Sequence, residues 1–201
     1  LNIDIDGKVI KEVLSNAEIT AKLKVIKIEK DTGEVIKRSG IKFKIKSLKT
    51  NDYVCQKVTY PKAETLCEFK TDDEGILITP YPLNSGDYVL EEVDQVIDGY
   101  TWNKESVPFS IDENTKFTED EEYGVLFETK FDNKEVKGKI TIKKIGETYI
   151  IKDNKIEYTT KNLSDITFGL YASEDIYSAN EVLKYKKDEL IGTYKTNKDG
   201  N

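Results

Sequence analysis

Short stretches of alternating apolar and polar residues, each about as long as one β-strand, recur along the whole chain and restrict the folds open to it. Examples lie at residues 23–28, 41–45 and 140–143. Alternation places every second side chain on one face of a strand, so that one face is buried while the other meets water. Turn residues separate the stretches, notably Asp31-Thr32-Gly33, Asp73-Glu74-Gly75, Asn84-Ser85-Gly86-Asp87 and Asp98-Gly99. The pattern predicts an all-β chain folded as Ig-like β-sandwiches, with a few helical residues near 173–181.

A repeat with an offset of 117 residues runs through these strands. It keeps apolar residues in phase and, after an insertion of eight residues, continues to the end of the chain. The matched positions are Gly7 with Gly124, Asn16 with Asn133, Lys27 with Lys144, Phe43 with Phe168, and Lys70-Thr71 with Lys195-Thr196. Such a period predicts sandwich repeats arranged in tandem.

The repeat divides the chain into three parts. We expect residues 1–20 to be the last strand of a preceding repeat, residues 21–136 a complete repeat, and residues 137–201 the N-terminal half of a following, truncated repeat. The chain is thus expected to be a fragment cut at both ends. No Gly/Ser-rich or Pro-rich linker separates the parts. Neighbouring repeats of the same chain are therefore expected partners that stack end to end as a semi-rigid rod.

The residue types that are missing exclude much of enzyme chemistry. His is absent, which removes the commonest general base and transition-metal ligand, and with it the Ser-His-Asp and Cys-His arrangements. No Gly-rich phosphate loop occurs. The formal net charge of −7 disfavours nucleic acid as a partner, and no run of about 18 apolar residues could span a membrane. We expect no cofactor, no metal site and no membrane insertion.

Three polar residues occupy positions where the alternation predicts an apolar side chain. Lys27 follows Leu23 and Val25 in phase, and Asn133 and Glu92 likewise follow apolar residues of their own strands. Each is costly to bury alone, because an unpaired charge or polar group loses its hydration. Either the three lie at strand ends and reach solvent, or they meet in the core and satisfy, or react with, one another.

The two cysteines, Cys55 and Cys67, flank a segment that contains Tyr60-Pro61 and is expected to turn back as a hairpin. If the flanking strands pair, the two Cα atoms come within reach of a disulfide, which an exported protein would permit. A disulfide and two free thiols both fit the sequence. A metal site is disfavoured, because two cysteines without His make a poor ligand set.

Several motifs, in this order and spacing, resemble the B-type repeats of Gram-positive collagen adhesins and SpaA-like pilins. The family opens with Lys-x-Asp-x-x-Thr-Gly and a Phe-containing strand, continues with a Thr-x-x-x-Gly turn and a Gly-x-Tyr-x-Leu-x-Glu segment, and closes with an Asn-bearing strand. The matching segments are residues 27–33, 40–43, 71–75, 86–92, 98–100 and 131–134. The resemblance covers residues 21–136 fully and implies a prealbumin-like sandwich on the surface of a Gram-positive bacterium, anchored to the cell wall.

The resemblance also implies a spontaneous isopeptide bond within the repeat. By position, Lys27 is the nucleophile, Asn133 the acceptor and Glu92 the acid that promotes the reaction by bonding the Asn carbonyl. Desolvation lowers the pKa of a buried Lys and raises that of a buried carboxyl, so both can be neutral at pH 7. Lys144 and Asn16 should be the unreacted crosslink residues of the truncated repeats. Since each molecule consumes its own side chains, this is not an enzyme.

The expected function is therefore that of a structural stalk repeat, with host extracellular matrix or sortase-linked subunits as further partners. The alternative is a ligand-binding adhesin module that recognises a host protein or glycan through its loops. Two readings are open for Trp102 and Tyr100: they stack against a sugar at such a binding site, or they form a hydrophobic lid over the core. A carbohydrate-active enzyme is a third class, for which no facing pair of acids is found.

Overall fold

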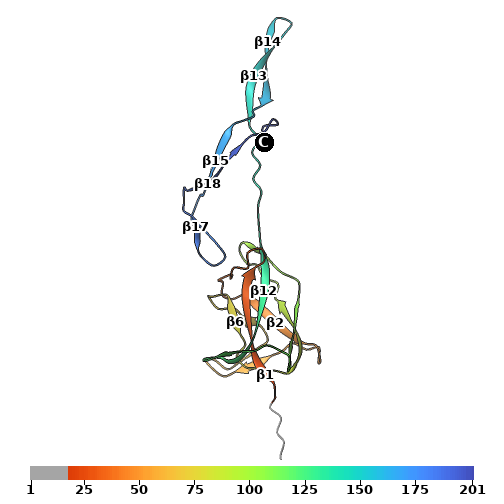
Figure 1. Cartoon of the computed structure of the whole chain (residues 1–201). Coiled ribbons are helices and arrows are strands. Elements are labelled where there is room, and N and C mark those ends of the chain that lie inside the picture. The colour runs from red at the N-terminus through yellow and green to blue at the C-terminus, as the bar shows by residue number, and fades with distance from the viewer. Residues whose placement is uncertain (1–17) are drawn as a thin grey trace, which may run out of the picture.

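The computed structural model describes residues 18–201, which form a β-sandwich followed by a C-terminal part made of hairpins (Figure 1). The described residues contain no α-helix, and so none that is long and apolar enough to cross a membrane. The strands of the sandwich are β1 (Thr20–Glu29), β2 (Lys42–Ser47), β3 (Gln56–Val58), β4 (Glu64–Leu66), β5 (Phe69–Lys70), β6 (Ile76–Ile78), β7 (Leu83–Asn84), β8 (Gly86–Glu92), β9 (Tyr100–Thr101), β10 (Val107–Ile111), β11 (Thr118–Asp120) and β12 (Gly124–Glu135).

Two sheets face each other across the hydrophobic core. One has the order β11–β12–β1–β6, with β7 also paired to β1 and β9 to β12, and the other has the order β10–β8–β2–β5. Every second residue of β1 is buried, as the alternation requires. The core residues include Leu23, Val25, Phe43, Ile45, Leu77, Leu90, Phe109, Ile111 and Phe131. The prediction of an all-β, Ig-like sandwich is confirmed.

The first and last strands of the sandwich are neighbours and run parallel. Their pairing extends from Lys22 opposite Leu126 to Glu29 opposite Asn133. The chain consequently enters the sandwich at one end and leaves it at the other (Figure 1). Inward side chains of β1 and β12 meet each other within this sheet, and they meet β8 of the facing sheet across the core.

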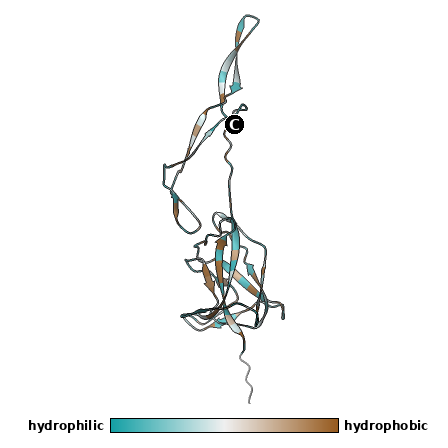
Figure 2. Cartoon of the chain, in the orientation of Figure 1, coloured by the Kyte–Doolittle hydropathy of each residue, from teal (hydrophilic) through white to brown (hydrophobic). Residues whose placement is uncertain are grey.

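The C-terminal part consists of two-stranded pairs whose apolar positions are visible in Figure 2. They are β13 (Ile145–Lys152) with β14 (Lys155–Asn162), β15 (Thr167–Tyr171) with β18 (Leu190–Lys195), and β16 (Ile176–Tyr177) with β17 (Leu183–Tyr185). The predicted strand at 140–143 is not formed, because no described strand pairs with it in the way that β6, β7 and β12 pair with β1. The helical residues expected near 173–181 are also wrong, since β16 and a turn lie there.

A buried threonine makes the same hydrogen bonds in both parts of the chain. The hydroxyl of Thr71 accepts the Ile41 amide at 3.0 Å, and that of Thr196 accepts the Ile166 amide at 3.0 Å. Each hydroxyl also donates to the carbonyl three residues before that isoleucine, at 2.6 Å and 2.7 Å. The threonine amides donate back to Ile41 and Ile166, again at 3.0 Å in both cases. The 125-residue offset of these partners is the one that the sequence repeat has after its insertion.

A glycine turn follows each threonine and bonds the equivalent lysine. Gly75 and Gly200 have φ angles of 74° and 79°, in the left-handed region that favours glycine. The carbonyl of Gly75 accepts the Lys27 amide at 3.0 Å, and that of Gly200 accepts the Lys144 amide at 2.7 Å. Lys144 therefore has the backbone contact in the C-terminal part that Lys27 has in the sandwich.

Candidate functional site

Lys27 lies inside the hydrophobic core, on the face of β1 that the alternation predicts. The residue is 0% exposed and follows the buried Leu23 and Val25 on the same face. In the parallel ladder Lys27 pairs with Phe131, so Asn133 lies two residues further along β12. The long lysine side chain bridges this offset and brings its amine to the Asn133 carboxamide.

Lys27, Glu92 and Asn133 form a closed set of buried contacts. The Lys27 Nζ donates to Asn133 Oδ1 and to Glu92 Oε2, the latter at 3.2 Å. The Asn133 Nδ2 donates to Glu92 Oε1 at 3.1 Å. Asn133 is 0% exposed and Glu92 5%. The structure thus brings together all three residues that the sequence singled out, and none of them reaches solvent.

One contact differs from the expectation. Glu92 was expected to bond the carbonyl of Asn133, but it bonds the amide nitrogen, while the carbonyl faces Lys27. The two oxygens of Glu92 therefore contact the two nitrogens of the site. This arrangement follows from the position of Lys27, which occupies the carbonyl side of Asn133 and leaves its Nδ2 facing β8.

Two aromatic rings enclose the amine and make its surroundings apolar. Phe43 and Phe131 meet edge to face with centroids 5.1 Å apart, and the Lys27 Nζ lies 5.6 Å and 4.5 Å from these centroids. Burial lowers the pKa of Lys27 from 10.5 to about 8, and attraction to Glu92 offsets part of this effect. The amine is therefore much easier to deprotonate than that of a surface lysine.

The backbone of Glu92 is held by the neighbouring strand β2 and by a tryptophan side chain. In the antiparallel pair of β2 and β8, Glu92 lies directly opposite Phe43. The indole Nε1 of Trp102 donates to the Glu92 carbonyl at 3.2 Å. The sequence indicates Trp102 but gives no sign that it bonds Glu92, because that contact depends on how the chain folds back after β8.

The acidic neighbours of the site point elsewhere. Asp132, beside Asn133, lies 3.6 Å from the amine of Lys30 and accepts a hydrogen bond from Asn103. Glu91, beside Glu92, accepts the Tyr53 hydroxyl at 2.9 Å on the exposed side. Strand alternation separates each outward carboxylate from its inward neighbour. Asn133, and not Asp132, is the residue that meets Lys27.

The remaining predicted residues lie away from this cluster. Cys55 and Cys67 form a disulfide across the β3–β4 hairpin. Lys144 is exposed, in the strandless segment before β13. Asn16 lies outside the described residues. Within the described range, no group of His, Cys, Asp or Glu side chains is arranged to hold a metal ion.

The cluster has the components of an amide transfer. A lysine with a lowered pKa supplies a nucleophile, a carboxamide supplies an acyl group, and a carboxyl that contacts both nitrogens can move a proton between them. Each component comes from a different strand, so the arrangement exists only after the two sheets have packed.

Comparison with known proteins identifies the fold. The model of the SpaA prealbumin-like fold domain matches residues 21–123. Among solved structures, the Bacillus anthracis TIE protein is 18% identical (90% of this chain, 26% of that chain, TM-score 0.48). The minor pilin GBS52 of Streptococcus agalactiae is 18% identical (63% and 49%, TM-score 0.45), and domains D2 and D3 of the Corynebacterium diphtheriae major pilin SpaD are 16% identical (59% and 48%, TM-score 0.43). The chain spans less than half of each of these structures. No curated protein matches it.

Proposed function

Since this chain belongs to the SpaA family of prealbumin-like domains, we propose that its sandwich is a stalk repeat of a bacterial adhesin or pilin-like protein, stiffened by a self-formed isopeptide bond. The bond joins Lys27 to Asn133, and Glu92 promotes it. The observation that carries the proposal is the closed set of buried contacts among these three side chains. A buried Lys, Glu and Asn are costly for stability alone, and this chemistry accounts for their presence in an apolar core.

The proposed reaction is an exchange of one amide for another. The neutral Nζ of Lys27 attacks the side-chain carbonyl carbon of Asn133, and the bond from that carbon to Nδ2 breaks. Glu92 takes a proton from Nζ through Oε2 and delivers one to Nδ2 through Oε1, so that ammonia leaves. No oxidant or cofactor is needed. Each molecule reacts once with its own side chains, and the reaction therefore has no turnover.

Folding itself places the three reacting groups in contact. The three groups are held in contact by β1, β8 and β12, which converts the reaction into an intramolecular step worth up to about 7–11 kcal/mol of barrier. The walls of Phe43 and Phe131 exclude water, which favours the neutral amine over the ammonium ion. The same exclusion of water protects the product from hydrolysis.

The bond would reinforce the sandwich where tension acts on it. The chain enters through β1 and leaves through β12, and these strands are joined by ladder hydrogen bonds. Pulling on the two ends shears that ladder. A covalent link between Lys27 and Asn133 would carry the load in place of the hydrogen bonds and would hinder the unfolding that proteases need.

We further propose that residues 21–136 are one repeat in a tandem array, that residues 1–20 are the last strand of a preceding repeat, and that residues 137–201 begin a following one. The matching bonds of Thr71 and Thr196, and of the two glycine turns, support this division. Lys144 would then be the nucleophile of the following repeat, and Asn16 the acceptor of the preceding one. The array would stand on a Gram-positive cell surface, anchored to the wall, and act with host matrix or sortase-linked subunits.

Intact-mass measurement of the folded chain tests the crosslink. We expect the mass to be lower than the sequence mass by one ammonia, with a branched tryptic peptide that links Lys27 to Asn133. Lys27→Met should show the full sequence mass, since it lacks the nucleophile. Glu92→Gln should show it soon after folding, since it lacks the proton shuttle and reacts far more slowly. An unshifted mass in the folded wild type would overturn the proposal.

Matched variants on the same strands control for general effects. Lys24→Met removes a partly exposed lysine of β1, and Glu91→Gln removes the outward carboxylate beside Glu92. Both should keep the loss of one ammonia. A loss of two would contradict the division into repeats, because Lys144 and Asn16 would then have reacted as well.

A further inference from the structure

The end of the sandwich from which β12 leaves is covered by part of the C-terminal region. We name this end, formed by residues 36–38, 98–100 and 135, the exit pole. The segment over it, residues 176–185, is the docking hairpin, which contains β16 and β17. The Lys37 amide donates to the Ala179 carbonyl at 3.1 Å, and Ala179 packs against the buried core cluster. These contacts join two parts of the chain that are otherwise connected by the strandless residues 136–144.

The tip of the docking hairpin is held in shape by its own hydrogen bonds. The Ser178 amide donates to the Val182 carbonyl at 2.9 Å, and the Val182 amide donates to the Ser178 hydroxyl at 3.2 Å. The Glu181 amide donates to the Ser178 carbonyl at 3.0 Å, with Glu181 at a φ of 64°. The tip therefore presents Ala179 without any help from the exit pole, as a docking element should.

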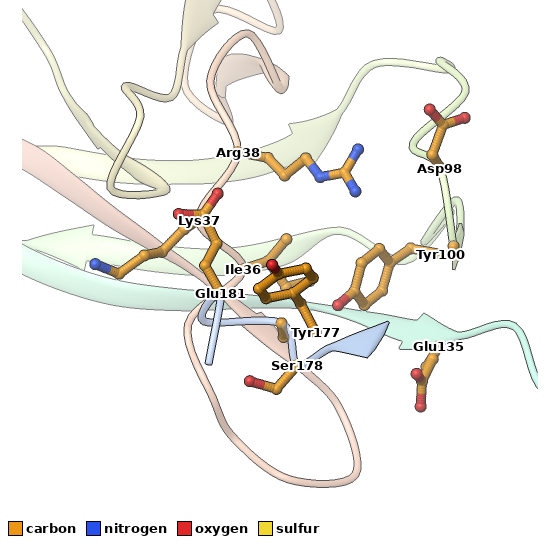
Figure 3. Close-up of a pocket in the computed structure, with 11 residues that line it drawn as sticks. Ile36, Lys37, Arg38, Asp98, Tyr100, Glu135, Tyr177, Ser178 and Glu181 are labelled. Atoms are coloured by element: carbon orange, nitrogen blue, oxygen red, sulfur yellow. The ribbon is translucent and has the colours of Figure 1, made fainter. Parts of the chain in front are cut away.

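Complementary groups face each other around this contact. Tyr177 of the hairpin lies near Ile36 and Tyr100 of the pole (Figure 3). Glu74, which binds Lys37 at 2.6 Å, raises the pKa of Lys37, and Glu181 of the hairpin adds to that effect. A cleft of about 530 Å³ remains between hairpin and pole. The contact is thus small: it consists of one backbone hydrogen bond, the apolar side chain of Ala179, and the attraction between Glu181 and Lys37.

The docking hairpin has a fixed place in the repeat. It lies in the connection between β15 and β18, and the sequence and hydrogen-bond matches equate these strands with β2 and β5 of the sandwich. The β2–β5 connection of the sandwich is residues 48–68, which hold the Cys55–Cys67 disulfide. Both parts of the chain therefore carry an ordered hairpin at the same position.

We propose that this connection is the contact between consecutive repeats: the hairpin between the second and fifth strands of one repeat binds the exit pole of the repeat before it. The partner of each hairpin is a second copy of the same fold, and the contact limits bending at the strandless linker. In the complete repeat, the disulfide fixes the shape of the corresponding hairpin. The Gln56 side chain also bonds the Tyr81 backbone, at 2.8 Å and 2.9 Å. This hairpin would bind the exit pole of a preceding repeat. The inference rests on the proposed tandem array.

Amide hydrogen exchange of the full chain tests the contact, with Ala179→Asp as the disrupting variant. The new carboxylate would lose hydration where Ala179 packs against the apolar core cluster, and it should expel the hairpin. In the wild type, we expect the Lys37 amide to exchange roughly threefold to tenfold more slowly than in Ala179→Asp, as one hydrogen bond predicts. Val182→Asp, at a side chain 58% exposed on the same hairpin, should match the wild type.

Two further readouts separate the possible failures. The Arg38 amide, bonded to Ile36 within the pole, should exchange equally in all three proteins and so report an intact loop. Spin labels on the sandwich and on β14 should give a narrow distance distribution that broadens only in Ala179→Asp. Equal Lys37 exchange in the wild type and Ala179→Asp would overturn the inference. The loss of one ammonia should persist in every variant. The mass therefore tests the crosslink, and amide exchange tests the docking contact separately.

Discussion

The rate of crosslink formation should follow the protonation of Lys27, because an amine attacks a carbonyl carbon only when it is neutral. Burial between Phe43 and Phe131 lowers the pKa of Lys27 from 10.5 to about 8. At pH 7 about one amine in ten is then neutral, compared with about one in three thousand for a lysine with a pKa of 10.5. The core thus raises the reactive fraction by about 300-fold.

This pKa predicts the shape of the pH profile. From about pH 5.5 to about pH 7 the rate should rise roughly tenfold per pH unit, bend near pH 8, and stay constant above it. The chain would be purified with a photocaged lysine at position 27, uncaged in urea and refolded by dilution into buffers across this range. Intact mass then follows the loss of ammonia with time.

Two outcomes would refute the reasoning. A rate that keeps rising tenfold per unit beyond about pH 9 would show that the core leaves the amine with the pKa of a surface lysine. A rate independent of pH would show that deprotonation does not limit the reaction. Glu92→Gln serves as the comparison, and it should react slower by roughly 10²–10⁴-fold, the usual contribution of a positioned proton shuttle.

Three further predictions concern stability. Burial would raise the pKa of Glu29, but hydrogen bonds from backbone amides and from Thr32 lower it from 4.5 to about 2. The ionised Glu29 therefore stabilises the folded state fully above about pH 4.5, and this stabilisation is lost as the pH falls through about 2. Urea unfolding should therefore show the wild type losing roughly 1–2 kcal/mol more than Glu29→Gln over that interval, a value reduced for solvent near the strand end. Thr71→Val should cost the sandwich about 1–3 kcal/mol in chemical unfolding, because it leaves the amide and carbonyl that it bonds unpaired, while Thr196→Val should leave the sandwich transition unchanged. Replacing both Cys55 and Cys67 with Ser should lower the free energy of unfolding by about 2–3 kcal/mol, and an unchanged midpoint would mean that the hairpin unfolds separately from the core.

The inward position of the three site residues was predictable from the sequence, because strand alternation is a local property. Lys27 continues the face of its apolar neighbours, and the phase of β12 distinguishes Asn133 from Asp132. That these residues meet depended on the family resemblance, since a contact between β1, β8 and β12 joins positions far apart in the chain. The orientation of the Asn133 amide was not predictable, because it follows from how Lys27 and Glu92 share the space around it.

Pairing between distant strands also explains the wrong predictions. Residues 140–143 have the composition of β1, yet a strand forms only where another strand supplies hydrogen bonds. The same limit applies to the docking hairpin. Its residues gave a weak helical pattern, and its shape depends on the Ser178–Val182 bonds, which leave no periodic signal in the sequence.

The parallel alignment of β1 and β12 also determines how far such a protein can reach. If the two strands were antiparallel, the chain would return to the end where it entered, and further repeats would add little length. In the proposed array each repeat would contribute the full extent of its last strand. With the 12 residues of β12 and a rise of about 3.3 Å per residue, one repeat would add roughly 40 Å. The number of repeats would thus set the height of the distal end above its base, in steps of about that size.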